Sequence, residues 1–128
     1  VFFNSLSDLG ATEERLQFNG ASAVSLASDI NVKFRKVILE KFKNHEISLL
    51  LGTDLLARGI DIENLEVVIN FDIPRDREAY THRAGRTGRM GNEGSVISFV
   101  THPEDLKKLK KFAKVSELVL KNQELHEK

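Results

Sequence analysis

Residues 82–91, "HRAGRTGRMG", place one histidine and three arginines among glycines that recur at every third position. The arginines are Arg83, Arg86 and Arg89. An arginine guanidinium is always charged, and its planar donors match phosphate oxygens. Glycine lets the backbone turn tightly and approach a ligand closely. Because like charges held together repel one another unless an anion lies between them, this segment predicts a phosphate-facing site.

A second segment with chemical potential is "TDLLARGIDI" (53–62), which directly follows an apolar run. In open parallel sheets, ligands bind beyond the carboxyl ends of the strands, so polar residues at such places are candidates. The segment offers a hydroxyl, guanidinium donors, an unobstructed backbone and a carboxylate, at Thr53, Arg58, Gly59 and Asp61. We expect segments 53–62 and 82–91 to lie near each other on the same edge of a sheet.

Simpler interpretations exist for both segments. An arginine-rich loop is often only a solvated surface, and the GxxGxxG spacing is not the dinucleotide-binding fingerprint. Thr53 or Asp54 could cap a helix that Gly59 ends, and capping is compatible with binding. His82 could be a hydrogen-bonded loop histidine without a further role, and the other three histidines show no metal-ligand spacing.

Composition limits the classes of protein that fit. The chain carries 19 basic and 19 acidic residues, so any polyanion site must be local rather than a property of the whole surface. It contains no cysteine, which excludes disulfides and thiolate metal sites and fits a reducing cytosol. No apolar run approaches the roughly 20 residues that a membrane span needs. We therefore expect an intracellular, cytoplasmic protein without a membrane partner.

Short apolar runs alternate with amphipathic stretches and predict the elements that hold these residues. Strands are expected over 1–3, 23–27, 48–52, 66–71 and 95–100, and helices over 7–18, 31–43 and 103–114. In the second helix, an apolar side is expected to contain Val32, Phe34, Val37, Ile38 and Phe42. In the last helix, the lysines favour a solvated face. Alternation of this kind predicts an α/β fold with a parallel sheet covered on both faces.

Four stretches together resemble one family: "VFFNS", "TDLLARGIDI", "INFDIP" and "YTHRAGRTGRMGNEG". Their order and separations are similar to the second RecA-like domain of DEAD-box RNA helicases, with motifs IV, V and VI at "VFFNS", "TDLLARGID" and "HRAGRTGR". The resemblance extends from residue 1 to about residue 114. It implies a RecA-like three-layer α/β/α sandwich with a mostly parallel central sheet. Residues 1–128 would form the second RecA-like domain, with the first outside this chain.

The resemblance also implies a role for each candidate residue. Arg86 and Arg89 would reach the ATP phosphates, and Arg89 is the better candidate for an arginine finger. It implies that Gly59 and Asp61 lie near the ATP ribose. It places Thr53, Arg58 and Arg35 on the RNA backbone. It implies that His82 couples the ATP site to the first domain. The full two-domain protein would use ATP with Mg²⁺ and bind single-stranded or duplex RNA. This chain alone would hold no cofactor stably and hydrolyse no ATP.

Two departures from the family pattern concern RNA. The family's Gln-x-x-Arg element keeps its arginine as Arg35, but Val32 stands where the glutamine is expected, and Ala27-Ser28 replaces a His-Gly pair. We therefore expect weaker RNA binding, mainly through Thr53 and Arg58. A non-catalytic adaptor with the same fold, or a DNA helicase domain, remains an alternative. The chain also has no phosphate-binding G-x-x-x-x-G-K-[ST] loop and no Asp-Glu dipeptide, which suits one half of an enzyme.

Overall fold

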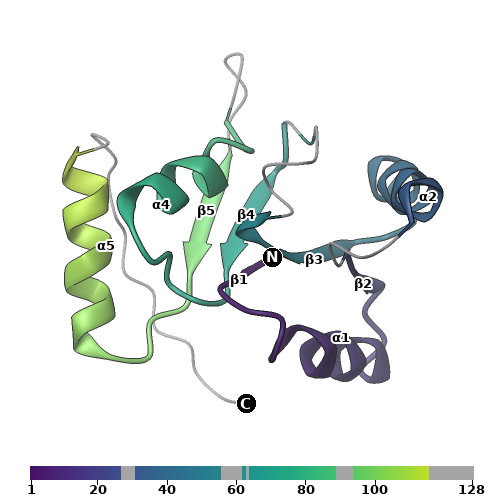
Figure 1. Cartoon of the computed structure of the whole chain (residues 1–128), viewed down its shortest axis with the longest axis horizontal. Coiled ribbons are helices and arrows are strands. Elements are labelled where there is room, and N and C mark those ends of the chain that lie inside the picture. The colour runs from purple at the N-terminus through teal and green to yellow at the C-terminus, as the bar shows by residue number, and fades with distance from the viewer. Residues whose placement is uncertain (27–30, 56–61, 63, 89–93, 116–128) are drawn as a thin grey trace.

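The computed structural model describes residues 1–26, 31–55, 62, 64–88 and 94–115. Within them, strands and helices alternate along the chain, except that β4 is the next described element after β3 (Figure 1). The strands are β1 (Phe2–Phe3), β2 (Ala23–Ser25), β3 (Leu49–Thr53), β4 (Val67–Asn70) and β5 (Ser95–Ser98). The helices are α1 (Leu9–Phe18), α2 (Val32–Lys43), α4 (Arg77–Ala84) and α5 (Pro103–Val115). The expected α/β class is confirmed.

The described strands form one sheet in the order β2-β3-β1-β4-β5, and every neighbouring pair is parallel. β1 lies at the centre, where Phe2 pairs with Gly52 on one side and with Asn70 on the other. Four of the strands lie inside the apolar runs that predicted them, and β3 extends one residue further, to Thr53. Because the strands are parallel, their carboxyl ends meet at one edge of the sheet.

Helices cover both faces of this sheet. Successive strand residues point to opposite faces, so Leu50 and Leu51 of β3 mark the two sides. Leu51 packs with Phe3 and with Leu9 of α1. Leu50 and Ile38 of α2 both pack against Leu26. α1 and α2 therefore lie on opposite faces, which confirms the three-layer arrangement.

α4 lies on the same face of the sheet as α2. The guanidinium of Arg83 in α4 lies 5.5 Å from the centre of the Phe2 ring. Phe2 pairs with Gly52, and so it points to the face that Leu50 presents to α2. α5 packs against α4 rather than directly on the sheet (Figure 1), through the cluster formed by Tyr80, Leu109 and Phe112.

The side of α2 that faces the sheet differs from the expected one. Val32, Phe34 and Val37 are 69%, 66% and 49% exposed. The half-buried side chains follow the spacing i, i+3, i+4, i+7 and are Arg35, Ile38, Leu39 and Phe42. The expectation holds for Ile38 and Phe42 but is wrong for the other three. Phe34 neighbours Ile38 on the helix but lies at the edge of the half-buried stripe, and Val37 lies beyond it, so both are exposed. Val32 is the first residue of the helix.

α4 is not among the helices that the sequence predicts. The helix has no apolar stripe, which is why hydrophobic periodicity does not reveal it. Its ends are nevertheless well defined. The Asp76 carboxylate accepts a hydrogen bond from the Ala79 backbone N–H at 2.8 Å, and Gly85 follows the last residue. Within the described residues, no helix is long and apolar enough to cross a membrane.

Candidate functional site

Arg83 lies at the centre of the carboxyl edge of the sheet and is fully buried. Its Nε and Nη2 donate to the two carboxylate oxygens of Asp54 at 2.6 and 2.7 Å. Nη1 donates to the Asp72 carbonyl at 2.8 Å and, more weakly, to the Asn70 side chain at 3.3 Å. Nη2 also donates to Asn4 Oδ1 at 2.8 Å. The guanidinium thus holds together the residues that follow β1, β3 and β4.

Asn4 and Asp72 make a second set of bonds between the loops after β1 and β4. The Asn4 backbone N–H donates to the Asp72 carboxylate at 2.8 Å, and Asn4 Nδ2 donates to the Ile73 carbonyl at 2.9 Å. Arg75 Nη2 donates to the Asn4 carbonyl at 3.1 Å. These contacts join segments almost 70 residues apart in sequence, so the edge of the sheet is one connected unit.

The role of Arg83 corrects the sequence-based interpretation of the arginine–glycine segment. That interpretation placed Arg83 with Arg86 and Arg89 in one phosphate-facing cluster. A guanidinium has five N–H donors, and the Arg83 donors point to Asp54, Asn4 and the end of β4. No donor remains for a phosphate. Burying such a charge is tolerated only where it is paired and hydrogen-bonded, as it is here.

Arg86 lies further along the chain, beside the residues that precede β4. Its backbone carbonyl accepts a hydrogen bond from the Leu65 N–H at 2.9 Å, and the next residue, Thr87, donates its hydroxyl to the Leu65 carbonyl. The half-buried Arg86 side chain lines a cavity of about 750 Å³, and its buried Nε has no hydrogen-bond partner among the described residues. A buried donor without a partner is costly, so this group is suited to an anion supplied from outside.

The two candidate segments do meet, as expected. Asp54 contacts Arg83 near the carboxyl ends of the strands, and Leu65 contacts Arg86 and Thr87 near the start of β4. The segment that follows β3 therefore touches α4 and the turn after it at two separate points. The expectation of a single edge is incomplete, because Arg86 lies toward the amino end of β4.

The other described candidates occupy different surroundings. Thr53 is half-buried at the last position of β3, next to Asp54. His82 is exposed on α4, although the neighbouring Arg83 is buried. The simpler interpretation of His82 as a loop histidine is therefore wrong, because His82 lies in α4. Arg35 is half-buried on the inner side of α2, and its buried Nε has no partner among the described residues.

Four predicted site residues lie outside the described residues: Arg58, Gly59, Asp61 and Arg89. The Ala27-Ser28 pair does so as well. The described residues on either side of 89–93 pack closely against each other. A Cβ placed on Gly94 would lie 2.6 Å from the Gly88 backbone nitrogen and even closer to the Thr87 hydroxyl. Gly88 has a positive φ of 68°, which glycine adopts without strain.

Sequence reasoning missed the polar partners of Arg83, above all Asn4, Asp54 and Asp72. Each of them comes directly or almost directly after a strand, which is the position that the carboxyl-end rule singles out. Applying that rule to every strand would have found them. Among the described residues, no group of three or more His, Asp or Glu side chains is placed to hold a metal ion.

Comparison with known sequences identifies relatives for most of the chain. The family model described as helicase conserved C-terminal domain matches residues 1–91. The ATP-dependent RNA helicase DeaD of Buchnera aphidicola is 40% identical over 86 residues, which cover 67% of this chain and 14% of that protein. DeaD of Escherichia coli K12 is 42% identical over 73 residues, covering 57% of this chain and 12% of that protein. The matched part thus spans a small fraction of these relatives.

Solved structures share the fold over nearly the whole chain. The C-terminal domain of the DEAD-box protein Dbp5 has a TM-score of 0.81 at 30% identity, covering 90% of this chain and 67% of that one. A DEAD-box protein from Methanococcus jannaschii has a TM-score of 0.78 at 33% identity, covering 92% of this chain and 32% of that one. Yeast Dbp5 bound to RNA and ADP BeF3 has a TM-score of 0.78 at 31% identity, covering 88% and 30%.

Proposed function

We propose a role for each part of this domain from one premise, that the chain belongs to the DEAD-box RNA helicases as their C-terminal RecA-like domain. In the full protein, the domain would supply arginines to ATP and backbone contacts to RNA, and so support duplex unwinding or the remodelling of RNA–protein complexes. The first RecA-like domain would be its partner within the same protein. An intracellular location also stays a prediction.

The observation that carries this proposal is the bidentate contact between Arg83 and Asp54. Asp54 directly follows Thr53, a candidate RNA contact, and Arg83 lies three residues before Arg86, a candidate ATP contact. A short ion pair, with Arg83 fully buried and Asp54 30% exposed, therefore connects the RNA segment to the ATP segment. A shift of the RNA segment would therefore move the ATP segment through this ion pair. An ATPase that depends on RNA requires such a connection.

On the ATP side, we assign Arg86 and Arg89 to the phosphates, with Arg89 as the arginine finger. The unpartnered Nε of Arg86 supports this assignment, because a phosphate oxygen would satisfy it. An arginine that meets the transferred phosphoryl group stabilises the charge of the transition state. Gly59 and Asp61 are assigned to the ribose. ATP with Mg²⁺ supplies the phosphoryl group and its charge neutralisation, and we assign the magnesium ligands to the first domain.

On the RNA side, we assign Thr53, Arg58 and Arg35 to the phosphate backbone. Thr53 lies at the carboxyl end of β3, and Arg35 has a buried Nε without a partner among the described residues. Backbone contacts of this kind position a strand without reading its sequence. The exposed imidazole of His82 is available to the first domain, which supports its assignment to interdomain coupling.

The test compares ATP hydrolysis by the full-length protein and by the 128-residue chain, with and without RNA. We expect RNA-stimulated turnover and unwinding of a short RNA duplex only in the full-length protein. RNA binding without any ATP turnover would instead identify an adaptor, and equal stimulation by single-stranded DNA would identify a DNA helicase. Turnover by the isolated chain above that of its Arg86→Ala, Arg89→Ala double variant would contradict the assignment of magnesium to the first domain.

A further inference from the structure

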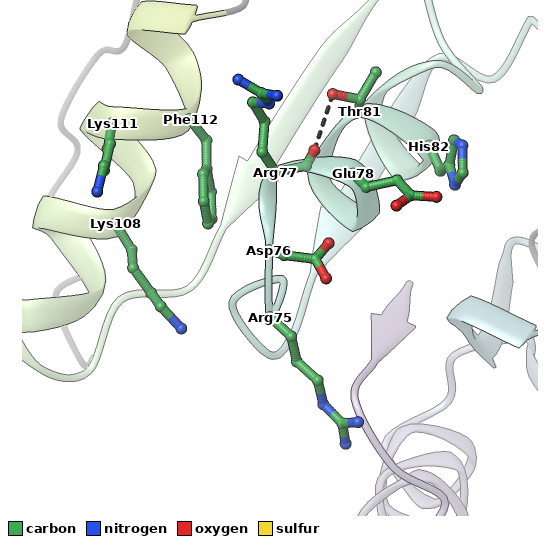
Figure 2. A pocket seen from close by; sticks show the side chains of 9 residues that line it. All are labelled: Arg75, Asp76, Arg77, Glu78, Thr81, His82, Lys108, Lys111 and Phe112. Carbon is green, nitrogen blue, oxygen red and sulfur yellow. Dashed lines mark hydrogen bonds between the residues drawn. The ribbon is translucent and has the colours of Figure 1, made fainter.

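A basic groove lies between α4 and α5, outside the residues assigned above to ATP and RNA, apart from His82 at its rim. Its volume is about 800 Å³. Figure 2 shows its lining: Arg75, Asp76, Arg77, Glu78, Thr81 and His82 come from α4 and the turn before it, and Lys108, Lys111 and Phe112 come from α5. Lys108 and Lys111 of α5, which the sequence predicts on a solvated helix face, therefore line this groove.

The charges in this groove are unbalanced. Four permanent cations and two carboxylates line it, although the chain as a whole is neutral. Of the cations, Arg75 points its guanidinium away from α5, to the Asn4 carbonyl (Figure 2). The Asp76 carboxylate already accepts the N-cap hydrogen bond from Ala79. In Figure 2, Lys108 extends from α5 toward the start of α4, where Arg75 and Asp76 lie. Bringing cations of two helices to one groove raises the electrostatic free energy unless an anion enters.

The groove adjoins the edge of the sheet where RNA is proposed to bind. Arg75, in the wall of the groove, donates a hydrogen bond to the carbonyl of Asn4, in the loop after β1. The Asn4 side chain in turn contacts Arg83, which is bonded to Asp54 next to Thr53. A strand held at Thr53 would therefore present its continuation to the groove at a high effective concentration.

The groove lining suits a phosphodiester backbone better than a base. Lys108 and Lys111 lie one turn apart, about 4.5 Å along the axis of α5, and offer successive positive charges. Phe112 is only 8% exposed, so its ring gives no platform on which a base could stack. Contacts in the groove would be made by charged side chains and would not depend on the RNA sequence.

We propose that this groove binds the backbone of RNA that extends beyond the core site of the helicase. The inference rests on the proposed function, since it needs RNA at the neighbouring edge. An acidic protein segment would find the same positive charges, but it would lack the neighbouring attachment that RNA bound at Thr53 has.

The experiment uses the full-length protein and two double variants of α5. Lys108→Glu, Lys111→Glu changes the groove. Lys107→Glu, Lys110→Glu changes net charge equally on the same helix, at exposed positions that do not line the groove. Affinity is measured for the shortest oligouridine that binds with a non-hydrolysable ATP analogue, and for the same RNA lengthened at either end. Thermal unfolding midpoints confirm that both variants fold.

We expect the wild-type protein and the control variant to bind the longer RNA more tightly than the short one. In the groove variant this gain in affinity, about fivefold in the wild-type protein, should disappear. The slope of log affinity against log salt concentration for the longer RNA should fall by about 1.4, as expected for two lost phosphate contacts. Its affinity for the short RNA should be unchanged. Equal losses in the groove and control variants, or no loss in either, would overturn the groove as an RNA site.

Two further outcomes separate this inference from the proposed function. If labelled oligoglutamate binds the wild-type protein but not the groove variant, while the gain from longer RNA persists in that variant, the groove serves an acidic protein segment and the inference fails. If the wild-type protein binds no short RNA at all, the proposed function fails first. Normal binding of short RNA with no effect of the groove variant overturns the groove alone.

Discussion

The Arg83 guanidinium and the Asp54 carboxylate form a bidentate ion pair, with Nε–Oδ1 and Nη2–Oδ2 distances of 2.6 and 2.7 Å. The Arg83 side chain is completely buried, while that of Asp54 is 30% exposed. The pair connects α4 to the end of β3 across 29 positions of sequence. Arg83 therefore has a structural role, whereas Arg86 and Arg89 of the same motif are assigned to ATP.

Replacing Arg83 should strongly destabilise the domain. Arg83→Ala would leave Asp54, Asn4 and the Asp72 carbonyl without their donor, and loss of one partner of a buried ion pair costs about 3–5 kcal/mol. Arg83→Lys keeps the charge but lacks the fork that serves all three groups, so it should recover only part of the stability. Urea unfolding measures both changes, with exposed Arg77→Ala as the control, expected within about 0.5 kcal/mol of wild type. A mild effect of Arg83→Ala would contradict the buried hub.

Gly94→Ala should strain the close contact of Gly94 with Thr87 and Gly88. The added Cβ would meet the Gly88 backbone nitrogen at 2.6 Å, and a backbone atom cannot move away as a flexible side chain can. Overpacking of this kind costs about 1–3 kcal/mol. Gly10→Ala is the matched control, since nothing lies within 4 Å of its Cβ position. Thermal unfolding of both variants checks the prediction, and equal midpoints would show that the backbone around Gly88 and Gly94 moves apart to admit the Cβ.

Arg89→Ala in the full-length protein should lower kcat by about 10² or more and leave nucleotide affinity nearly unchanged. A group that acts on the charge of the transition state affects the chemical step rather than the bound ground state. Steady-state ATPase kinetics at saturating RNA provide the measurement. Arg15→Ala, an exposed arginine of α1 on the opposite face of the sheet, should leave kcat unaltered. A raised KM with normal kcat would make Arg89 a binding residue.

Arg58→Ala should weaken RNA binding to the same extent for every sequence and reduce the salt slope by about one. A lost phosphate contact removes affinity uniformly, because the backbone carries no sequence information. Titrations of oligouridine, oligoadenine and a mixed-sequence strand at several salt concentrations test this. Loss confined to one sequence would point to base recognition instead.

Val32→Gln should tighten binding of single-stranded RNA by up to about 1 kcal/mol, the net contribution of one hydrogen bond. Val32 begins α2 and is 69% exposed, so a glutamine there can point toward a ligand without disturbing the core. The interpretation of Val32 as a core residue is therefore wrong, and stability should change by less than about 0.5 kcal/mol. The control is Val37→Gln on the same helix, which should leave RNA affinity unaltered. An unchanged dissociation constant in Val32→Gln would show that residue 32 does not reach RNA.

The sequence by itself determined the fold class and the segments of the site. Apolar runs such as 66–71 are short, continuous and bounded by turn residues, which is the pattern of strands buried in a parallel sheet. The motifs identified the family because their order and separation are properties of the chain. That segments 53–62 and 82–91 would meet also followed from the sequence, since both come after strands of one parallel sheet.

Only the tertiary structure decided which arginine of the motif is structural. Arg83 and Arg86 look equivalent in "HRAGRTGR", but the groups that neutralise Arg83 come from distant segments: Asn4 is 79 positions away and Asp54 is 29. The same holds for the outward side of α2 and for the cations that α4 and α5 bring to one groove. Local sequence encodes periodicity and capping, whereas burial of a charge depends on the partners that the folded chain places around it.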